Sequence, residues 1–362
     1  MRSGWGRWSR VAGRWTRRRG VYRPMQRVAV PVVILATGLL LGVEASAARG
    51  GWEPMPLPPT STPAPLTERG DAASPWAGVY AVAPDLASCR PGRLAPTEQA
   101  RALALLNDIR RLHGLGPVDW DATQEEPVMR AALLFAANGQ LSHTPSAHWR
   151  CLSAAGAQGA ASSNIHLWVG SAGSLPRRSE DVVIGFLTDI GNRVSGNIGH
   201  RRWMLDPFLK RVAFGRVGAR AGAMLHDGAA LSVVDVAGGL NDAGGLGGSA
   251  RADHWAWPQG VYPARYFHPE AFLSFSAIVD LTERAANAAV DYRGASVSVR
   301  RADGRPLVVS QLSFDHHGYG LPNSLQFKAA GIEPDIEHEV LIQGVRAAGV
   351  PRDYRYRFRI VP

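Results

Sequence analysis

The stretch NIGHRRWML, residues 197–205, places a titratable ring just before a run of bulky apolar side chains. His200 lies in a glycine-containing turn, and two arginines separate it from Trp203, Met204 and Leu205. A neutral imidazole is a common zinc ligand, and its proton exchanges near neutral pH, so the ring could serve a metal or an acid–base step. It could equally be an interior histidine with satisfied nitrogens. The choice depends on which other groups come within reach of His200.

The sequence lacks the common hydrolase motifs. It contains no Gly-x-Ser-x-Gly, no His-Glu-x-x-His and no Ser-x-x-Lys. Ser163 follows His143 and suggests a serine nucleophile, but the serine-rich segment ASSNI at residues 161–165 is more simply a loop.

The elements that must position these residues are predicted to be helices in the first part of the chain. The segment PTEQARALALLNDIRRLHGLG predicts a helix that Thr97 caps and Gly114 ends. A second helix is expected to begin with a capping box of Asp121 and Gln124 and to end at Gly139.

A third helix is predicted from Ser179 to Ile190, with Glu180 and Asp181 in its first turn, where acids favour the helix dipole. The Gly/Ala/Ser-rich residues 153–163 are expected to form a loop. After Arg211, the segments RVAFGRVG, GAMLHDG and AALSVVDVAG read as short strands between glycine turns. This order predicts an α/β fold with helices packed around an antiparallel sheet.

The last hundred residues have the pattern of an all-β domain. The segment ASVSVRRADGRPLVVSQLSF predicts a hairpin that turns at Asp303-Gly304. Apolar residues alternate further on, so each set should occupy one sheet face; they are Val340 and Ile342, and then Tyr354, Tyr356, Phe358 and Ile360. A small β-sandwich of immunoglobulin type fits this pattern.

The N-terminus is typical of an export signal. Basic residues precede an apolar run at residues 28–43, and the small residues Ala45 and Ala47 follow, which predicts cleavage after Ala47. A complete signal also begins at Met25, which we take as the possible true start. A twin-arginine signal and an uncleaved signal anchor are the alternatives. After cleavage we expect no stable membrane span.

The predicted signal segment carries most of the net positive charge, and export also bears on the state of the cysteines. Nine arginines precede residue 28 and Glu44 is the one acid before residue 48, so this segment carries +8 of the formal +10. The remaining basic residues are scattered, which argues against a nucleic-acid partner.

Cys89 and Cys151 are the only cysteines, and export to an oxidising compartment predicts that they form a disulfide rather than two buried thiols. Only two of the 40 basic residues are lysine, a bias typical of a GC-rich bacterial genome.

The order and spacing of several short motifs resemble the CAP superfamily of cysteine-rich secretory, antigen and pathogenesis-related proteins. The motifs are WDATQ at residue 120, ALLFAANGQLSH ending at His143, SSNI at residue 162 and GHRRWML at residue 199. The resemblance covers residues 97–237. It implies a CAP-like α-β-α sandwich followed by the all-β domain.

In that family a cleft holds two histidines and two acids. Carried over by position, the histidines are His143 and His200, and one acid is Asp189, an aspartate where glutamate is usual. Ser163, followed by Asn164, stands where the second acid is expected. Two imidazoles near one carboxylate could bind zinc weakly, and binding should fade below about pH 6 because imidazole must be neutral to coordinate. A structural hydrogen-bonded network is the other interpretation. His148 and His166 lie near the missing acid, but we expect both at the surface.

The resemblance implies an extracellular binding role, secreted or in the cell envelope, rather than catalysis. The expected partner is a lipid, another small ligand, a protein, a cell-envelope component or a divalent metal. The alternative is a metal-dependent peptidase or esterase that uses His143, Asp189 and His200. The chain is expected to comprise a signal over residues 1–47, a proline-rich linker over 48–78, a CAP-like domain over 79–237, a glycine-rich linker over 238–252 and a β-sandwich over 253–362.

Overall fold

A computed structural model describes residues 76–171, 174, 176–192, 194, 196–234 and 253–362. The expected signal with its alternative start at Met25, nearly all of the proline-rich linker and the glycine-rich linker lie outside these residues. We refer below to residues 76–234 as the α/β region and to residues 253–362 as the β region. Within the described residues, no helix has the length and apolarity needed to cross a membrane.

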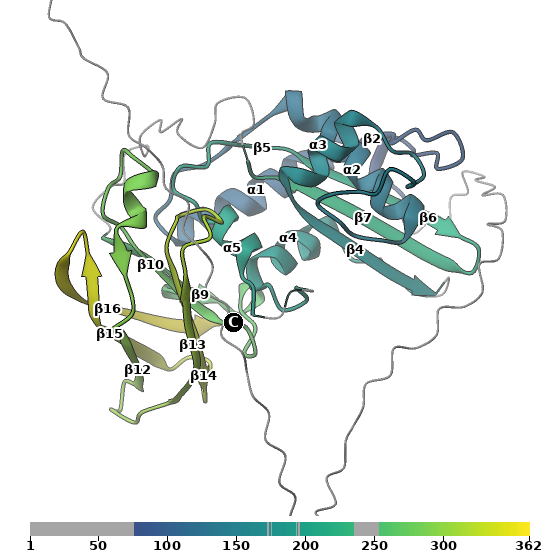
Figure 1. Ribbon diagram of the computed structural model, residues 1–362. Helices are drawn as coiled ribbons and strands as arrows, with labels where there is room; N and C mark the ends of the chain where they lie inside the picture. Colours follow the sequence, from purple (N-terminus) through teal and green to yellow (C-terminus); the bar gives the residue numbers. More distant parts are fainter. Residues whose placement is uncertain (1–75, 172–173, 175, 193, 195, 235–252) are drawn as a thin grey trace, which may run out of the picture. The chain divides into compact units, whose positions relative to one another are not determined.

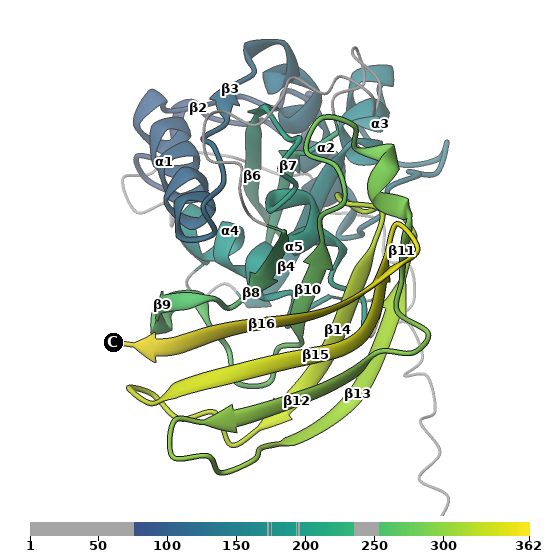
Figure 2. The same ribbon diagram turned by 90° about the vertical axis from the view of Figure 1, so that its left-hand side faces the viewer.

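An antiparallel sheet in the order β4-β7-β6 lies at the centre of the α/β region. Helices α2 and α3 cover one side of it, and α1 and α4 lie on the other side (Figures 1 and 2). The helices are α1 (Pro96–Leu112), α2 (Glu125–Asn138), α3 (Ala154–Ala161), α4 (Ser179–Thr188) and α5 (Gly199–Met204), and η1 (Ala122–Gln124) is a 3₁₀ turn. The strands are β1 (Tyr80–Val82), β2 (Arg93–Leu94), β3 (Asp119–Trp120), β4 (Ser163–Ser171), β5 (Arg211–Val212), β6 (Phe214–Ala221) and β7 (Met224–Ser232). The predicted α-β-α arrangement is confirmed.

Close backbone approach joins α2 to the sheet. A Cβ atom added at Gly228 of β7 would lie 2.4 Å from the carbonyl oxygen of Ala132, and one at Gly215 of β6 would lie 2.5 Å from the backbone of Val128. Any larger residue at either position would push the helix away. Glycine in these strands therefore fixes the distance between α2 and the sheet.

Several local predictions need correction. Residues 153–163 do not form a loop: Ser153 caps α3 through a hydrogen bond from the Gly156 amide (3.1 Å), and Ser163 begins β4. The eight residues of α3 are Ala, Gly and Gln, so they lack the apolar stripe that marks most helices. Packing against α2 stabilises the helical conformation of α3 instead.

The helix termini also differ from the sequence prediction. Thr97 does not cap α1, since Ala95 occupies the N-cap position without a side-chain bond. Asp121 accepts from the Thr123 amide at the start of η1 and so is a cap, but Gln124 does not complete a capping box. Gly139 ends α2 in the left-handed conformation, as predicted (φ +58°).

The β region consists of two sheets whose inner faces share a core. One sheet has the order β13-β14-β10-β8, and the other has the order β11-β15-β16-β9 with β12 also paired to β15. The ring of Phe275 in β10 lies 5.0 Å from the ring of Tyr354 in β16, which places the two sheets face to face. The strands are β8 (His254–Trp257), β9 (Gly260–Pro263), β10 (Leu273–Ala277), β11 (Val290–Asp291), β12 (Ser296–Arg301), β13 (Val308–Asp315), β14 (Ser324–Ala330), β15 (Glu337–Ala347) and β16 (Val350–Val361), and the 3₁₀ turns are η2 (Ala264–Tyr266) and η3 (Ala285–Ala288).

The alternating residues of β15 and β16 are buried as predicted. The predicted hairpin at Asp303-Gly304 forms only next to its turn, where the Arg301 amide donates to the Arg305 carbonyl and the Leu307 amide to the Val299 carbonyl (both 2.9 Å). Gly304 does turn the chain with a positive φ of 84°. The strands on either side then diverge, because β12 pairs with β15 while β13 pairs with β14 in the opposite sheet. Packing between the faces of a sandwich, rather than local pairing, decides where these strands lie.

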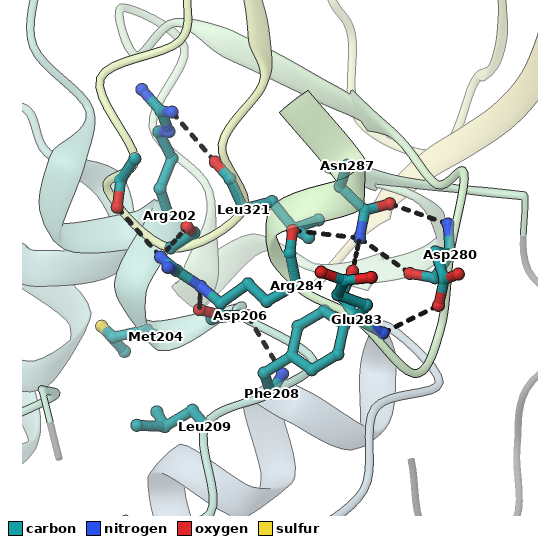
Figure 3. A network of polar contacts seen from close by, with 12 residues as sticks. Arg202, Met204, Asp206, Phe208, Leu209, Asp280, Glu283, Arg284, Asn287 and Leu321 are labelled. Atoms are coloured by element: carbon teal, nitrogen blue, oxygen red, sulfur yellow. Dashed lines mark hydrogen bonds and ion pairs between the residues drawn. The ribbon is translucent and has the colours of Figure 1, made fainter. Parts of the chain in front are cut away.

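The two regions bury one continuous core that includes Leu106 of α1 and Trp255 of β8. Polar contacts cross the same boundary. Trp255 donates from its indole nitrogen to the carbonyl oxygen of His113 (3.0 Å), and Arg284 of the β region donates to the buried carboxylate of Asp206 (3.0 Å; Figure 3). The described parts of both regions therefore support each other.

The predicted disulfide is confirmed between Cys89 and Cys151. It ties the segment that links β1 and β2 to the residues just before α3. The 62-residue separation corresponds to about 4 kcal/mol in a chain-entropy model of the unfolded state.

His113, at the end of α1, is a buried titratable group on the boundary between the regions. Its Nδ1 lies 2.9 Å from the carbonyl oxygen of Ala256, and its Nε2 lies 3.2 Å from the hydroxyl of Tyr262. Burial lowers the pKa of His113 to about 3, and the nearby cation of Arg201 adds to that effect. The ring therefore remains neutral in the folded protein.

We predict that His113 makes the fold less stable in acid. Its folded pKa lies below the unfolded value of 6.5, so its contribution is complete above pH 6.5 and is lost as the pH falls toward 3. Lowering the pH from about 6.5 to about 5 should cost about 2 kcal/mol through this residue. In His113→Gln, denaturant titrations across this range should show about one proton less taken up on unfolding. His148→Gln, at an exposed position, is the control. An unchanged pH slope in His113→Gln would contradict the assignment.

Candidate functional site

His200 is the second residue of α5 and is oriented by Asp189. Its Nδ1 lies 2.6 Å from Oδ1 of Asp189. Because a carboxylate only accepts, Nδ1 carries the proton and donates it, which leaves Nε2 as an acceptor when the ring is neutral. The Phe186 ring, with its centroid 5.1 Å away, packs against the imidazole. The ring is therefore fixed in both orientation and tautomer.

Asp189 ends α4 in the left-handed conformation, with φ of +54°. Its side chain is 1% exposed, and both oxygens are occupied. Oδ1 accepts from His200 and from the Asn192 amide (3.2 Å), while Oδ2 accepts from the backbone N–H of Arg201 (3.0 Å). The left-handed turn therefore aims this carboxylate at the start of α5.

The buried arginine Arg201 joins α5 to both regions. From Nε and Nη2 it donates to the carbonyl oxygens of Leu187 and Thr188 at 2.6 and 3.0 Å. From Nη1 it donates to the carbonyl oxygen of Phe272 (2.6 Å) and the hydroxyl of Ser274 (3.1 Å) in the β region. Arg201 thus fixes the end of α4 and the edge of β10 with a single side chain.

The residues that anchor α5 differ from those expected. The sequence suggested the apolar run from Trp203 to Leu205; Met204 and Leu205 are indeed buried, but Trp203 is only partly so. Arg202 adds a second polar anchor, with an ion pair to Asp315 at 2.7 Å. A pair of arginines after a histidine looks like a solvated surface in a sequence, so these anchors could not be recognised there.

His143 reaches the same place from the segment between α2 and α3. Its Nδ1 lies 2.8 Å from the carbonyl oxygen of Ala160. A carbonyl only accepts, so Nδ1 again carries the proton and Nε2 is left as an acceptor. Both candidate histidines therefore have one nitrogen anchored and the other free of hydrogen bonds to described residues.

A cavity of about 300 Å³ brings most of the candidate residues together. His143, Ser163, Asn164 and His200 line it, whereas Asp189 lies behind His200 and does not. The other lining residues are Ala161, Ser162, Asn192, Val194, Asn197, Gly199, Trp203, Val233, Val234 and Tyr319. The resemblance did not indicate Asn192, Asn197 or Tyr319.

Ser163 is the residue of greatest chemical interest in the wall. It is 4% exposed, and its hydroxyl oxygen is buried with no hydrogen-bond partner among the described residues. Asn164 beside it donates from Nδ2 to the carbonyl oxygen of His200 (3.0 Å) and so ties β4 to α5. An unpaired buried hydroxyl costs free energy unless a ligand or water satisfies it.

The two neighbouring histidines behave differently from each other. His148 is exposed, as expected. His166 is not a surface residue: it packs edge-on against Phe186 (6.4 Å between centroids), and its Nε2 is buried without a partner among the described residues. Burial and the nearby cations of Arg177 and Arg216 lower the pKa of His166 to about 4. It is not among the residues that line the cavity.

The residues present do not make a complete metal site. Both oxygens of Asp189 are engaged in hydrogen bonds, and Ser163 stands in place of the second acid. The Nε2 atoms of His143 and His200 are therefore the two remaining candidate metal ligands. Zinc in catalytic sites usually takes three protein ligands plus water. The described part of the chain holds no cluster of three or more His, Cys, Asp or Glu residues suited to a metal ion.

Comparison with known proteins identifies the α/β region. Residues 103–226 match the family model described as the cysteine-rich secretory protein family, CAP, and this part of the chain is a CAP domain. No curated protein matches the chain. Similar solved structures include that of an extracellular protein containing a SCP domain from Bacillus anthracis str. Ames, with 16% identity and a TM-score of 0.21. That match covers 38% of this chain and 44% of the other, so it spans less than half of that protein.

We predict that Asp189 fixes the His200 ring. Asp189→Asn replaces one acceptor oxygen with an amide donor, so the side chain can no longer accept from both His200 and the Arg201 amide. The free energy of unfolding should fall by about 2 kcal/mol. In ¹⁵N NMR spectra, the Nδ1–H tautomer of His200 should give way to a mixture. The matched variant Asp119→Asn, at an exposed site, should change neither property. An unaltered His200 tautomer in Asp189→Asn would refute the proposed role.

Proposed function

We propose that this protein is exported and that its CAP domain binds a small molecule in the cavity between His143 and His200. The observation that carries the proposal is the arrangement of polar groups that line the cavity. Two imidazoles are held through Nδ1, and the buried Ser163 hydroxyl has no partner among the described residues. Hydrogen bonds within the protein orient this constellation, which is typical of preformed binding pockets.

Export is supported by two independent features of the chain. Residues 1–47 have the composition of a signal, and the Cys89–Cys151 disulfide suits an oxidising compartment. The segment limits inferred from the sequence, with a CAP-like domain over residues 79–237 and a β-sandwich over 253–362, are part of the same proposal.

Binding is favoured over catalysis by the hydrogen bonds. An activated nucleophile needs a base within hydrogen-bond reach, and the Ser163 hydroxyl bonds to neither histidine. The metal-dependent hydrolase that would use His143, Asp189 and His200 gains little support, because Asp189 orients His200 instead of facing the cavity. Two imidazoles could still hold a divalent metal weakly.

The proposal predicts that a molecule copurifying with the exported protein depends on this cavity. Ala161→Phe places a ring in the lining at one end of α3, whereas Ala154→Phe places the same ring on the exposed opposite end. Mass spectrometry of extracts should detect the bound compound in the wild type and in Ala154→Phe, at wild-type amounts. Ala161→Phe should reduce it at least about tenfold, a change equivalent to about 1.4 kcal/mol. Equal amounts in the two variants would place the molecule elsewhere, and no bound compound in any of them would count against the proposal.

A further inference from the structure

We propose that the cavity takes a neutral ligand rich in hydroxyl groups, a saccharide unit, and that Tyr319 of the β region supplies the ring against which it packs. This inference rests on the proposed binding function and names the class of ligand. It draws on the charge of the lining, its hydrogen-bonding atoms and the placement of Tyr319.

No described residue of the lining carries a carboxylate, ammonium or guanidinium group. Two charged side chains next to the described lining are already committed: Asp189 is bonded to His200 and to the Arg201 amide, and Arg202 is paired with Asp315 while its guanidinium carbon lies 5.6 Å from the centroid of the Tyr319 ring. An ionic ligand would lose its water without gaining an opposite charge in exchange. The site therefore favours an uncharged molecule.

The free polar atoms of the wall are mainly acceptors. In their neutral forms His143 and His200 accept at Nε2, because the hydrogen bond of each ring places its proton on Nδ1. Asn164 uses its amide nitrogen on the carbonyl of His200, so its Oδ1 is left to accept. The Ser163 and Tyr319 hydroxyls can donate or accept. Such a wall pairs best with a ligand that brings several donors, as the hydroxyl groups of a sugar do.

The lining also contains two aromatic rings, Trp203 of α5 and Tyr319 of the loop between β13 and β14. The Tyr319 side chain is 37% exposed, and its hydroxyl has no hydrogen bond to the described residues. An aromatic ring with a polar tip offers an apolar face and a donor at once. A volume of about 300 Å³ is at the small end of ligand pockets, which suits a compact ring rather than a long acyl chain.

Tyr319 is held in place by its neighbours. Arg284 donates to the carbonyl oxygens of Gly318 (2.9 Å) and Gly320, and Arg202 donates to that of Leu321 (3.1 Å; Figure 3). Gly320 has a φ of +62°, and a Cβ added there would lie 2.2 Å from the carbonyl oxygen of Arg202. Anchoring on both sides presents the ring in a fixed position, which lowers the entropy lost on binding.

The test is to titrate small-molecule probes into the full-length exported protein and to detect binding by saturation-transfer NMR. The neutral probes are glucose, galactose, mannose, N-acetylglucosamine and its β-1,4-linked dimer. The charged probes are glucosamine and N-acetylglucosamine 6-phosphate, and dodecanoate, an anion with a long acyl chain, is the lipid-like probe. At least one neutral sugar should bind about tenfold more tightly than the charged sugars or dodecanoate.

Three variants locate that binding. Tyr319→Ala should weaken it about tenfold, and Tyr319→Phe, which keeps the ring, should weaken it less. Ser163→Ala should also weaken it, by about three- to tenfold, while the melting temperature stays the same or rises, because the lost hydroxyl has no partner. That combination separates a ligand contact from a folding defect.

The outcomes also separate this inference from the binding function beneath it. If dodecanoate or a charged probe binds best and Ala161→Phe blocks it, the cavity is a binding site and the saccharide assignment is wrong. If no neutral sugar binds, the saccharide assignment is likewise wrong. If, in addition, no compound copurifies in a manner that depends on Ala161, the proposed function fails as well. Sugar binding that is indifferent to Tyr319→Ala and Ser163→Ala would overturn the inference by placing the sugar elsewhere.

Discussion

The cavity of this protein depends on a guanidinium group that is removed from water. Arg201 is 1% exposed, and its side chain is held by backbone carbonyls, a hydroxyl and a ring rather than by a carboxylate partner. The guanidinium carbon lies 3.7 Å from the centroid of the Trp257 ring, a cation–π contact inside the core. Burial lowers the pKa of Arg201 to about 10, so the group remains charged near neutral pH. The cost of burying that charge is met only if the end of α4, α5 and β10 keep their present positions.

This constraint explains why a short helix can carry the site. Six residues of α5 have little stability of their own. The same turn presents His200 toward the cavity and directs Arg201 and Arg202 to the β region. The β region in turn contributes Tyr319 to the lining of the cavity. The CAP domain and the β region therefore build one wall together, and neither is simply an appendage of the other.

The fold class could be predicted from sequence because it rests on periodic patterns. The alternating residues of β15 and β16, the stop at Gly139 and the pairing of Cys89 with Cys151 all reflect local rules or compartment chemistry. Helix α3 could not be predicted from its own residues, since Ala and Gly gain their helical state from packing on α2. The divergence of β12 and β13 beyond the turn at Gly304 has the same origin, because packing between the two sheets decides which strands they pair with.

Some residues of the site could likewise be predicted from the sequence, and others could not. His143, Ser163, Asn164 and His200 come together where the family resemblance implied, and Asp189 lies behind them. Tyr319 lies more than a hundred residues further along the chain, in a region outside the resemblance, so no spacing rule could connect it to His200. The role of Arg201 was hidden for a physical reason: arginine is usually exposed, and only the structure shows that its hydrogen bonds are all made inside.

Hydrogen–deuterium exchange of the variant Arg201→Lys tests this account most directly, with Arg220→Lys at an exposed position of β6 as the control. Lysine keeps the charge but lacks the planar fork that reaches Leu187, Thr188 and Phe272 together. We predict faster exchange in the end of α4, in α5 and in β10 at once, with the control unchanged. Faster exchange confined to α5, with β10 protected as in the wild type, would contradict the claim that Arg201 couples the cavity to the β region.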